Sequence, residues 1–444
     1  MALKSRTVFV CANCAFTSPR WQGRCPECGE WNTFSEQQTS KINSKSERVV
    51  PTLLSEVSTE NLQRFSSGMD ELDVVLGGGF VPGSLVLLGG DPGIGKSTLA
   101  LQVALHAHKH GKRVVYISGE ESAYQIKLRA GRLSAHADVP VVPETNLESV
   151  VEMLEQQKPD LAVIDSVQTL HSELVNGVVG GVSQIAFATN QLLRLSKTHH
   201  ITTVIIGHVT KEGMLAGPKT LEHMVDTVLY LEGERFTSLR VLRGSKNRFG
   251  NTGEVGVFEM AESGLVEVAN PSMVFLEQRT KAFSGSCTAA ILEGNKVLML
   301  EVQALTTKTN FGYPRRAVSG FDVNRLQLLL AILQKRLKVD VSSQDVYINV
   351  TGGFDLDERA ADLPVVLAIL SSLKDVVIPH SLAAFGEIGL SGEVRGVQQA
   401  EKRLREAAKL GFTRVICGGK QTNVIKKIEI IPVTEISQVQ TFLK

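Results

Sequence analysis

The chain has 444 residues, which is enough for two to four domains. Its 47 Lys and Arg residues nearly balance its 46 Asp and Glu residues, which excludes a histone-like polycation and a wholly disordered acidic protein. No apolar run approaches the roughly 20 residues that cross a bilayer, and the first residues lack the pattern of a secretory signal. Four of the six cysteines crowd into the first 28 residues, unlike a disulfide framework, so we expect a cytoplasmic protein with no membrane partner.

The first predicted element is a zinc module at residues 1–34. It contains two CxxC pairs separated by ten residues, Cys11 with Cys14 and Cys25 with Cys28. Each pair can turn two thiolates toward one point, and two pairs complete the tetrahedral shell that Zn²⁺ prefers. A segment this short gains much of its folding free energy from the metal, so the site is expected to be structural. A pair of redox dithiols and a rubredoxin-like iron site are the alternatives.

Residues 35–60 are polar and rich in Ser, which predicts a linker. Residues 61–270 then alternate short apolar runs with longer helical patterns. The runs LVLLGG, RVVYISG, LAVIDS and TTVIIGH are expected to be buried strands, and helices are expected near residues 96–110, 121–133, 147–157 and 183–198. Strands that alternate with helices form a parallel sheet covered on both faces, so this domain is predicted to be α/β.

The segment GDPGIGKS matches the phosphate-binding pattern GxxxxGK[ST] and joins a predicted strand to a predicted helix. Its glycines let backbone N–H groups surround phosphates, and the helix N-terminus favours negative charge. Lys96 is expected to contact the β- and γ-phosphates of ATP, Ser97 to ligate Mg²⁺, and Thr98 to lie near the α-phosphate. The residues predicted to bind the nucleotide are Gly90, Asp91, Pro92, Gly93, Ile94, Gly95, Lys96, Ser97 and Thr98.

Polar residues at the ends of neighbouring predicted strands complete the nucleotide site. Asp165 ends the apolar run LAVID, and it is expected to hold Mg²⁺ through water. Hydrolysis also needs a group that positions the attacking water, and Glu120 is the predicted residue, with Glu121 as the second choice. Glu121 is equally well explained as a charge at a helix N-terminus. His208 follows the fourth strand and is expected either to contact the γ-phosphate or to serve a structural role.

Several motifs, taken in chain order, resemble those of the bacterial RadA family, also called Sms. They are the cysteine pairs, GGDPGIGKST, SGEES, VIDS, GHVTK, AGPKTLEH and KNRFG, and the resemblance covers essentially the whole chain. It implies a RecA-like P-loop ATPase of recombinational repair, in which Glu120 matches the catalytic glutamate. It also implies a hexameric ring that binds single-stranded and branched DNA, cooperates with RecA, and promotes branch migration as a helicase-like motor.

The pentapeptide KNRFG is the most specific of these motifs. Its two cations lie on a predicted turn, where they can contact phosphate groups. They are expected either to act on the ATP of a neighbouring subunit or to contact the DNA backbone, and a solvated turn is the alternative. The residues are Lys246, Asn247, Arg248, Phe249 and Gly250. Lys211 and Lys219, which lie in a long Gly-rich connection, are expected to face a central DNA channel.

Residues 271–444 are predicted to be a separate α+β domain. CTAAILEG and KVLMLEVQAL are expected to pair as strands, and helices are expected at VNRLQLLLAILQKRL, AADLPVVLAILSSL and AEKRLREAAKLGF. Residues 345–418 resemble the proteolytic domain of Lon, which implies a serine–lysine dyad. Ala360 stands at the serine position and Glu401 at the lysine position, although a shift of one residue would place Lys402 there. We therefore predict a Lon-like fold without protease chemistry.

Two basic clusters indicate what this domain does instead. Residues 308–338 contain seven Lys and Arg and one Asp, and residues 395–427 contain nine Lys and Arg and two Glu. Such clusters in a nearly neutral chain predict a positive face for the DNA backbone, with solvated helix faces as the alternative. The favoured function is a DNA-stimulated ATPase that acts on recombination intermediates. The competing hypotheses are an ATP-dependent protease and a nucleotide-gated scaffold resembling KaiC.

Overall fold

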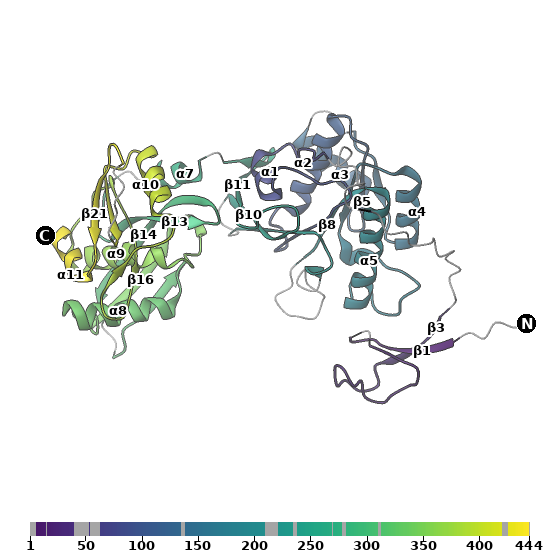
Figure 1. Cartoon of the computed structure of the whole chain (residues 1–444), viewed down its shortest axis with the longest axis horizontal. Coiled ribbons are helices and arrows are strands. Elements are labelled where there is room, and N and C mark those ends of the chain that lie inside the picture. The colour runs from purple at the N-terminus through teal and green to yellow at the C-terminus, as the bar shows by residue number, and fades with distance from the viewer. Residues whose placement is uncertain are drawn as a thin grey trace, which may run out of the picture. The chain divides into compact units, whose positions relative to one another are not determined.

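The computed structural model describes residues 6–14, 16–39, 53, 63–134, 138–208, 221–233, 238–268, 270–277, 281–309, 312–419 and 425–443. By its internal contacts the chain divides into two compact units (Figure 1). Unit 1 consists of Met1–Glu232, Arg240–Thr252 and Phe258–Glu267, and unit 2 consists of Gly233–Leu239, Gly253–Val257 and Val268–Lys444. Among the helices of the described residues, none combines the length and the apolar character that a bilayer span requires.

The N-terminal module is a small antiparallel sheet in the order β2-β1-β3. Its strands are β1 (Arg6–Cys11), β2 (Thr17–Ser18) and β3 (Phe34–Thr39). β3 continues beyond residue 34, so a strand occupies the first residues of the segment expected to be a linker. Among the described residues of this module, the buried cluster consists of Cys11, Cys25 and Phe34, with Phe9, Phe16 and Cys28 partly buried against it. A core of this size does not stabilise a fold by apolar burial alone, which is consistent with a structural metal.

A nine-stranded sheet forms the centre of unit 1, in the order β12-β11-β10-β9-β4-β8-β7-β5-β6. The neighbouring strands β9, β4, β8, β7, β5 and β6 are parallel to one another. By contrast, β10 is antiparallel to β9, and β12 is antiparallel to β11. The expectation of a purely parallel sheet is therefore wrong on one side, because parallel pairing needs long crossovers and the last strands are joined by short connections. The strands are β4 (Leu85–Gly90), β5 (Val114–Ser118), β6 (Val141–Pro143), β7 (Leu161–Asp165), β8 (Thr202–Ile206), β9 (Thr227–Glu232), β10 (Leu239–Asn247), β11 (Val255–Ala261) and β12 (Gly264–Glu267).

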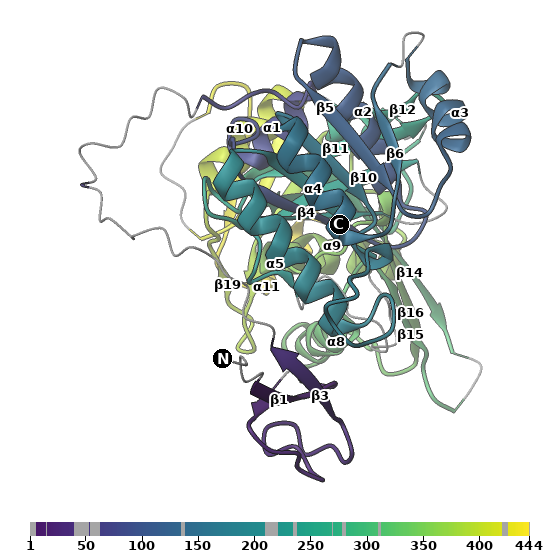
Figure 2. The same cartoon turned by 90° about the vertical axis from the view of Figure 1, so that its right-hand side faces the viewer.

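Helices cover both faces of the parallel strands, as the alternating pattern predicts. Val86 and Leu88 of β4 belong to one buried core with α1, α2 and α3, and Leu85 and Leu87 belong to a second core with α4 and α5. This alternation arises because successive side chains of a strand point to opposite faces. Figure 2 shows α4 and α5 side by side on their face of the sheet. The helices are α1 (Asp70–Leu76), α2 (Lys96–Lys109), α3 (Ala123–Leu133), α4 (Leu147–Gln157) and α5 (Val182–His199).

Unit 2 is built on a mixed seven-stranded sheet in the order β15-β16-β14-β13-β17-β20-β21, with a separate pair β18-β19. The predicted hairpin is confirmed: β13 and β14 pair antiparallel, with Leu292 opposite Val297. α9 packs on these two strands. The strands are β13 (Ser286–Glu293), β14 (Lys296–Lys308), β15 (Arg316–Ser319), β16 (Gln344–Val350), β17 (Leu382–Phe385), β18 (Glu387–Ile388), β19 (Val394–Arg395), β20 (Arg414–Gly418) and β21 (Glu429–Val433). The helices are α7 (Pro271–Glu277), α8 (Val323–Leu337), α9 (Asp362–Lys374), α10 (Ala400–Lys409) and α11 (Ile436–Val439).

Candidate nucleotide and zinc sites

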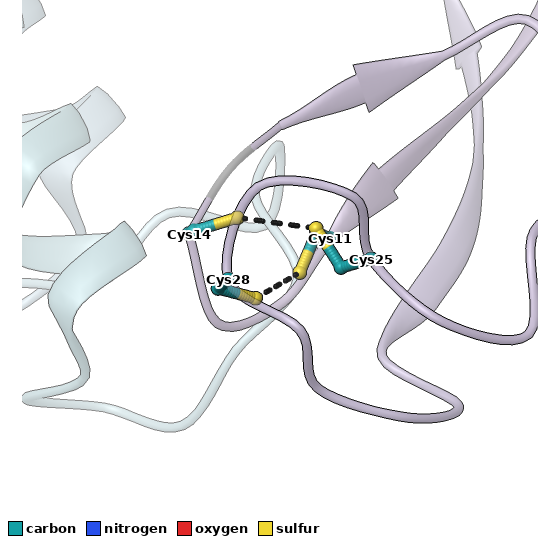
Figure 3. Close-up of side chains that lie close together, drawn as sticks. All are labelled: Cys11, Cys14, Cys25 and Cys28. Carbon is teal, nitrogen blue, oxygen red and sulfur yellow. Dashed lines mark hydrogen bonds between the residues drawn. The ribbon is translucent and has the colours of Figure 1, made fainter.

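The four N-terminal cysteines converge on one point (Figure 3). Their sulfur atoms all lie within 4.8 Å of one another. The Sγ atoms of Cys11 and Cys28 are 3.7 Å apart, and those of Cys14 and Cys25 are 3.5 Å apart. Four Zn–S bonds of about 2.3 Å in a tetrahedron place the sulfur atoms about 3.8 Å apart, so the cysteines fit a zinc ion. All four cysteines are free of disulfides.

A hydroxyl that sequence reasoning missed supports this zinc site. Oγ1 of Thr33 lies 3.1 Å from Sγ of Cys11. Burial opposes the Cys11 thiolate, but hydrogen bonds from Thr33 and from the backbone N–H groups of Cys14 and Asn13 outweigh it and lower the pKa of Cys11. A thiolate is the form that binds zinc. The threonine five residues after Cys28 gives no recognisable sequence signal, because it reaches Cys11 only through the folded sheet.

The phosphate-binding loop runs from the end of β4 into the start of α2. Its backbone requires glycine: Gly90, Gly93 and Gly95 have φ values of 146°, 78° and 117°. A Cβ atom at Gly90 would lie 2.4 Å from the Leu231 carbonyl oxygen. The positive φ angles of these glycines orient backbone N–H groups of the loop toward a ligand, as the motif predicts.

Lys96, the first residue of α2, lies inside this loop. Its Nζ donates hydrogen bonds to the carbonyl oxygens of Gly90 at 2.8 Å and Asp91 at 2.9 Å. Burial lowers the Lys96 pKa to about 8, although the carboxylates of Asp165, Asp91 and Glu120 partly oppose the shift. Phosphate oxygens are stronger acceptors than these carbonyls, so the ammonium group is placed to exchange one set of partners for the other.

Asp165, at the end of β7, is almost fully buried and oriented by a tyrosine. The hydroxyl of Tyr116 in β5 donates a 2.7 Å hydrogen bond to Oδ2 of Asp165. Burial, followed by the Asp165 charge, raises the Tyr116 pKa well above its usual value, so the phenol stays a donor. Because Tyr116 donates to Oδ2, Asp165 would hold Mg²⁺ through its other carboxylate oxygen. Tyr116 lies within the predicted strand RVVYISG, but only the pairing of β5 with β7 brings the two residues together.

The two candidate carboxylates after β5 have different surroundings. Glu120 is 43% exposed, and its Oε1 accepts a 2.6 Å hydrogen bond from the Ser166 hydroxyl. Glu121 instead forms an ion pair with Arg129 of α3. A group that positions the attacking water must be open to the nucleotide side, and this favours Glu120 over Glu121.

His208, two residues after β8, lies beside Glu120. Its Nε2 is 3.4 Å from Oε1 of Glu120, and both ring nitrogens are buried without a hydrogen-bond partner among the described residues. Burial and then the Lys96 charge lower the His208 pKa, so the imidazole is neutral at pH 7. A neutral imidazole beside Glu120 and near Lys96 is suited to donate to a phosphate oxygen.

The KNRFG pentapeptide lies at the opposite end of the sheet from the phosphate-binding loop. Asn247 pairs with Thr227, and Thr227 pairs with Val86 near the start of β4. The phosphate-binding loop begins after Gly90 at the other end of β4. From Val86 to Gly90 the strand rises by four residues, which is about 13 Å. The pentapeptide therefore cannot reach the nucleotide site that its own subunit contains.

Three residues of the pentapeptide, Asn247, Phe249 and Gly250, hold the turn in its conformation. The Asn247 amide donates to the Leu76 carbonyl at 3.1 Å, and its Oδ1 accepts from the Phe249 N–H at 2.9 Å. Gly250 packs so closely on Gly77 that a Cβ there would lie 3.2 Å from the Gly77 Cα. This leaves the two cations as the chemically active groups of the motif.

The two cations are held on different partners. Nζ of Lys246 donates to the carbonyl oxygens of Glu222 at 2.7 Å and His223 at 3.2 Å. Arg248 is 55% exposed and lies 3.5 Å from the buried carboxylate of Asp226. Asp226 also pairs with Lys197 at 2.6 Å, so it keeps a cation partner if Arg248 turns away. Lys211 and Lys219, the expected channel residues, lie outside the described residues.

In unit 2 the expected protease positions carry no dyad. Ala360 lies in the 3₁₀ turn Arg359–Ala361 before α9 and is completely buried. Glu401 forms an exposed ion pair with Arg405, and the Lys402 ammonium donates to the Asn295 carbonyl.

Two cations of the predicted basic clusters are also internal. Arg325 pairs with Asp362, and the completely buried Arg403 pairs with Glu358. These two arginines stabilise unit 2 and are unavailable to DNA, which corrects part of the expected positive face.

The fold and the two sites define a RecA-like P-loop ATPase core with an N-terminal four-cysteine zinc module and a C-terminal Lon/ChlI-like domain. Known families agree: residues 54–214 match the AAA domain, residues 9–36 the rubredoxin metal binding domain, and residues 312–421 subunit ChlI of Mg-chelatase. A solved structure of the RadB recombinase is 24% identical over 46% of this chain and 99% of its own, with a TM-score of 0.36, a value too low to support any argument.

Curated relatives identify the family. A DNA repair protein RadA of Streptococcus pyogenes is 47% identical over 98% of both chains, and that of Bacillus subtilis is 45% identical over 98% of both chains. That of Listeria monocytogenes is 48% identical over 93% of this chain and 92% of its own. The chain belongs to the RadA family of DNA repair proteins, as the motif resemblance implied.

Proposed function

We propose that this protein is a DNA-dependent ATPase that acts on recombination intermediates during DNA repair. The observation that carries the proposal is the meeting of Lys96, Asp165 and Glu120 at one phosphate-binding loop, in a chain 47% identical to a DNA repair protein RadA. The three residues supply the charge, the metal ligand and the water-positioning carboxylate that phosphoryl transfer to water requires.

Each residue of the site has a defined role in this proposal. The loop from Gly90 to Thr98 binds the phosphates of ATP through its N–H groups, and Lys96 neutralises the β- and γ-phosphates. Ser97 and Asp165 would hold Mg²⁺, which neutralises phosphate charge when it is bound. Glu120, oriented by Ser166, positions the attacking water, and His208 contacts the γ-phosphate.

The pentapeptide acts on the nucleotide of a neighbouring subunit. Lys246 and Arg248 lie at the far end of β4 from their own phosphate-binding loop. A head-to-tail interface that closes into a ring can bring this end of one subunit to the loop of the next. The guanidinium group of Arg248 then stabilises charge on the transferred phosphoryl group. We propose a ring on this basis, and the family resemblance implies that the ring has six subunits.

A mixing experiment tests this shared site. Lys96→Ala and the double variant Lys246→Ala, Arg248→Ala are each expected to be inactive alone. In a one-to-one mixture that exchanges subunits, about a quarter of the head-to-tail interfaces join an intact loop to an intact pentapeptide, so ATPase activity returns. A mixture that stays inactive, although mixed oligomers form, contradicts action between subunits.

The remaining proposed partners are those that the resemblance to the RadA family implies. We propose that the ring binds single-stranded and branched DNA, cooperates with RecA and promotes branch migration in the cytoplasm. The exposed cations of residues 308–338 and 395–427 contribute phosphate contacts. Single-stranded DNA should raise the ATPase rate, and the oligomer should be sized in parallel. Turnover that never responds to DNA at any salt concentration contradicts the proposal and favours the nucleotide-gated scaffold.

We propose that unit 2 has no protease activity. Ala360 has no nucleophilic atom, and its completely buried position leaves a peptide no access. A casein-cleavage assay with ATP should show no activity above that of the Lys96→Ala variant. Cleavage that depends on ATP would overturn this part of the proposal.

A further inference from the structure

Two exposed tryptophans mark a surface of the zinc module that the ATPase mechanism does not use. Trp21 and Trp31 are the only tryptophans of the chain, and they are 54% and 67% exposed. Neither belongs to the buried cluster of Cys11, Cys25 and Phe34. Exposed tryptophan commonly contributes to binding, because its large rigid ring buries much area at a small cost in conformational entropy.

The two indole rings border the same glycine. A Cβ atom at Gly23 would lie 3.8 Å from the nearest atom of the Trp21 ring and 3.8 Å from that of the Trp31 ring. Because residue 23 is glycine, it places no side chain between the two rings.

An arginine accompanies each ring, and the exposed Glu27 and Glu30 lie in the same segment. Arg24 and Trp31 face each other as an antiparallel bridge, and the Arg24 guanidinium lies 5.9 Å from the Trp31 ring centroid. Nε of Arg24 donates to the Gly29 carbonyl at 2.9 Å, which fixes the guanidinium group beside the ring. Arg20, which precedes Trp21, is exposed as well. Aromatic rings next to arginines match a ligand that combines flat rings with negative charge.

The metal site holds this arrangement in place. The Asn32 N–H donates to the Gly23 carbonyl at 2.8 Å, and the Cys25 N–H donates to the Glu30 carbonyl at 2.8 Å. These bonds form the hairpin that places zinc ligands Cys25 and Cys28 between Arg24 and Trp31. Loss of zinc should therefore separate the two rings.

We propose that Trp21 and Trp31 form a stacking platform for unpaired nucleobases, with Arg24 and Arg20 contacting the adjacent phosphates. The inference rests on the proposed function, because it assigns the zinc module a part in gripping the DNA that stimulates the ATPase. Stacking on aromatic rings accepts every base, so the platform should bind single strands with little sequence preference. Duplex DNA should bind it poorly, since its bases already stack on one another.

Tryptophan emission, excited at about 295 nm so that tyrosine does not contribute, tests the platform directly, because both tryptophans of the chain lie in it. Zinc-loaded protein is titrated with oligo(dT) and with an abasic oligonucleotide of equal length, which keeps the phosphates and lacks the bases. Oligo(dT) should quench the emission, and the abasic strand should leave it largely unchanged. The single variants Trp21→Phe and Trp31→Phe assign the quenching to each ring.

Binding of a labelled oligo(dT), followed by anisotropy, gives the second measurement. Trp21→Ala and Trp31→Ala should each weaken binding about tenfold while zinc content is retained. Tyr124→Ala, which removes an aromatic residue that is 70% exposed elsewhere in unit 1, is the matched control and should bind as the wild type does.

Three results separate the competing explanations. If labelled oligo(dT) binds but tryptophan emission and both alanine variants are unaffected, the platform is overturned while the proposed function stands. If the alanine variants lose RecA and keep DNA, the surface is a protein-docking site and the inference is wrong. If no variant and no wild-type protein binds DNA, the proposed function itself fails.

Discussion

The Ser166 hydroxyl donates a 2.6 Å hydrogen bond to Oε1 of Glu120, although the two residues are far apart in sequence and follow different strands. The bond forms because β5 and β7 are parallel neighbours whose last residues, Ser118 and Asp165, lie opposite each other. The residues that follow the two strands therefore meet. Ser166, the residue after Asp165, thereby orients the carboxylate proposed to position water. Ser166 is completely buried, so it fixes one orientation of Glu120.

Ser166→Ala should therefore lower kcat for ATP hydrolysis and leave nucleotide affinity nearly unchanged. Loss of the hydroxyl allows Glu120 to rotate, and misplacement of a catalytic group by about 1 Å costs roughly 100-fold. Steady-state ATPase assays and titration with a fluorescent ATP analogue separate kcat from binding. Glu121→Gln is the control and should retain turnover, since Glu121 pairs with Arg129. A Glu121→Gln variant as inactive as Glu120→Gln would reassign the role.

Tyr116→Phe should raise the Mg²⁺ concentration needed for half-maximal activity. The substitution removes the donor that fixes Oδ2 of Asp165 and leaves a buried carboxylate oxygen without its partner. The lost hydrogen bond to a charged group should also lower the free energy of unfolding by about 1.5–3 kcal/mol. Tyr230 lies in β9 of the same sheet, and Tyr230→Phe removes its 2.9 Å hydrogen bond to Glu222; this variant should leave the Mg²⁺ dependence unchanged.

Nucleotide affinity should fall as the pH rises above about 8. Burial lowers the Lys96 pKa to about 8, so the free protein carries a protonated Lys96 below this pH and loses the proton above it. Phosphate binding needs the ammonium form, and the dissociation constant should then rise by up to about tenfold per pH unit. Titration with a fluorescent ATP analogue between pH 7 and pH 9.5 measures this. A flat profile over that range would show that the Lys96 pKa is near its usual value.

The sequence predicts the elements whose periodicity and motifs are local. The glycine loop, the helix from Lys96 and the strand ending at Asp165 are of this kind, and the structure contains each of them. The antiparallel strands β10 to β12 were missed because Gly and polar residues interrupt their apolar pattern. The long-range partners were also missed. Tyr116 and Ser166 are ordinary residues in sequence, and only the order of strands in the sheet gives them their neighbours.

Zinc content should depend on the N-terminal cysteines alone. Cys14→Ser leaves three thiolates of a four-thiolate shell, so the variant should lose most of its zinc on exposure to a chelator. Cys287→Ser is the matched control, because Cys287 is a buried cysteine of unit 2. Both proteins are analysed for metal by atomic absorption after dialysis. Equal zinc content in the two variants would show that the four-cysteine cluster is not the metal site.

Glu358→Gln should destabilise unit 2 strongly. The completely buried guanidinium group of Arg403 donates to Glu358 Oε2 at 3.0 Å and to the Ala290 carbonyl at 2.6 Å, and it lies 5.7 Å from the Phe385 ring centroid. Neutralising Glu358 leaves a buried cation without its counter-charge, which typically costs about 3–5 kcal/mol.

Urea denaturation measures this cost, with Glu401→Gln as the control. Glu401 forms an exposed ion pair with Arg405 on α10, the helix that also carries Arg403, and exposed pairs contribute about 0–1 kcal/mol. The midpoint of unit 2 unfolding should therefore fall markedly for Glu358→Gln and barely for Glu401→Gln. If the two variants unfold at the same urea concentration, Arg403 does not depend on Glu358 for its charge compensation, and its other contacts stabilise it instead.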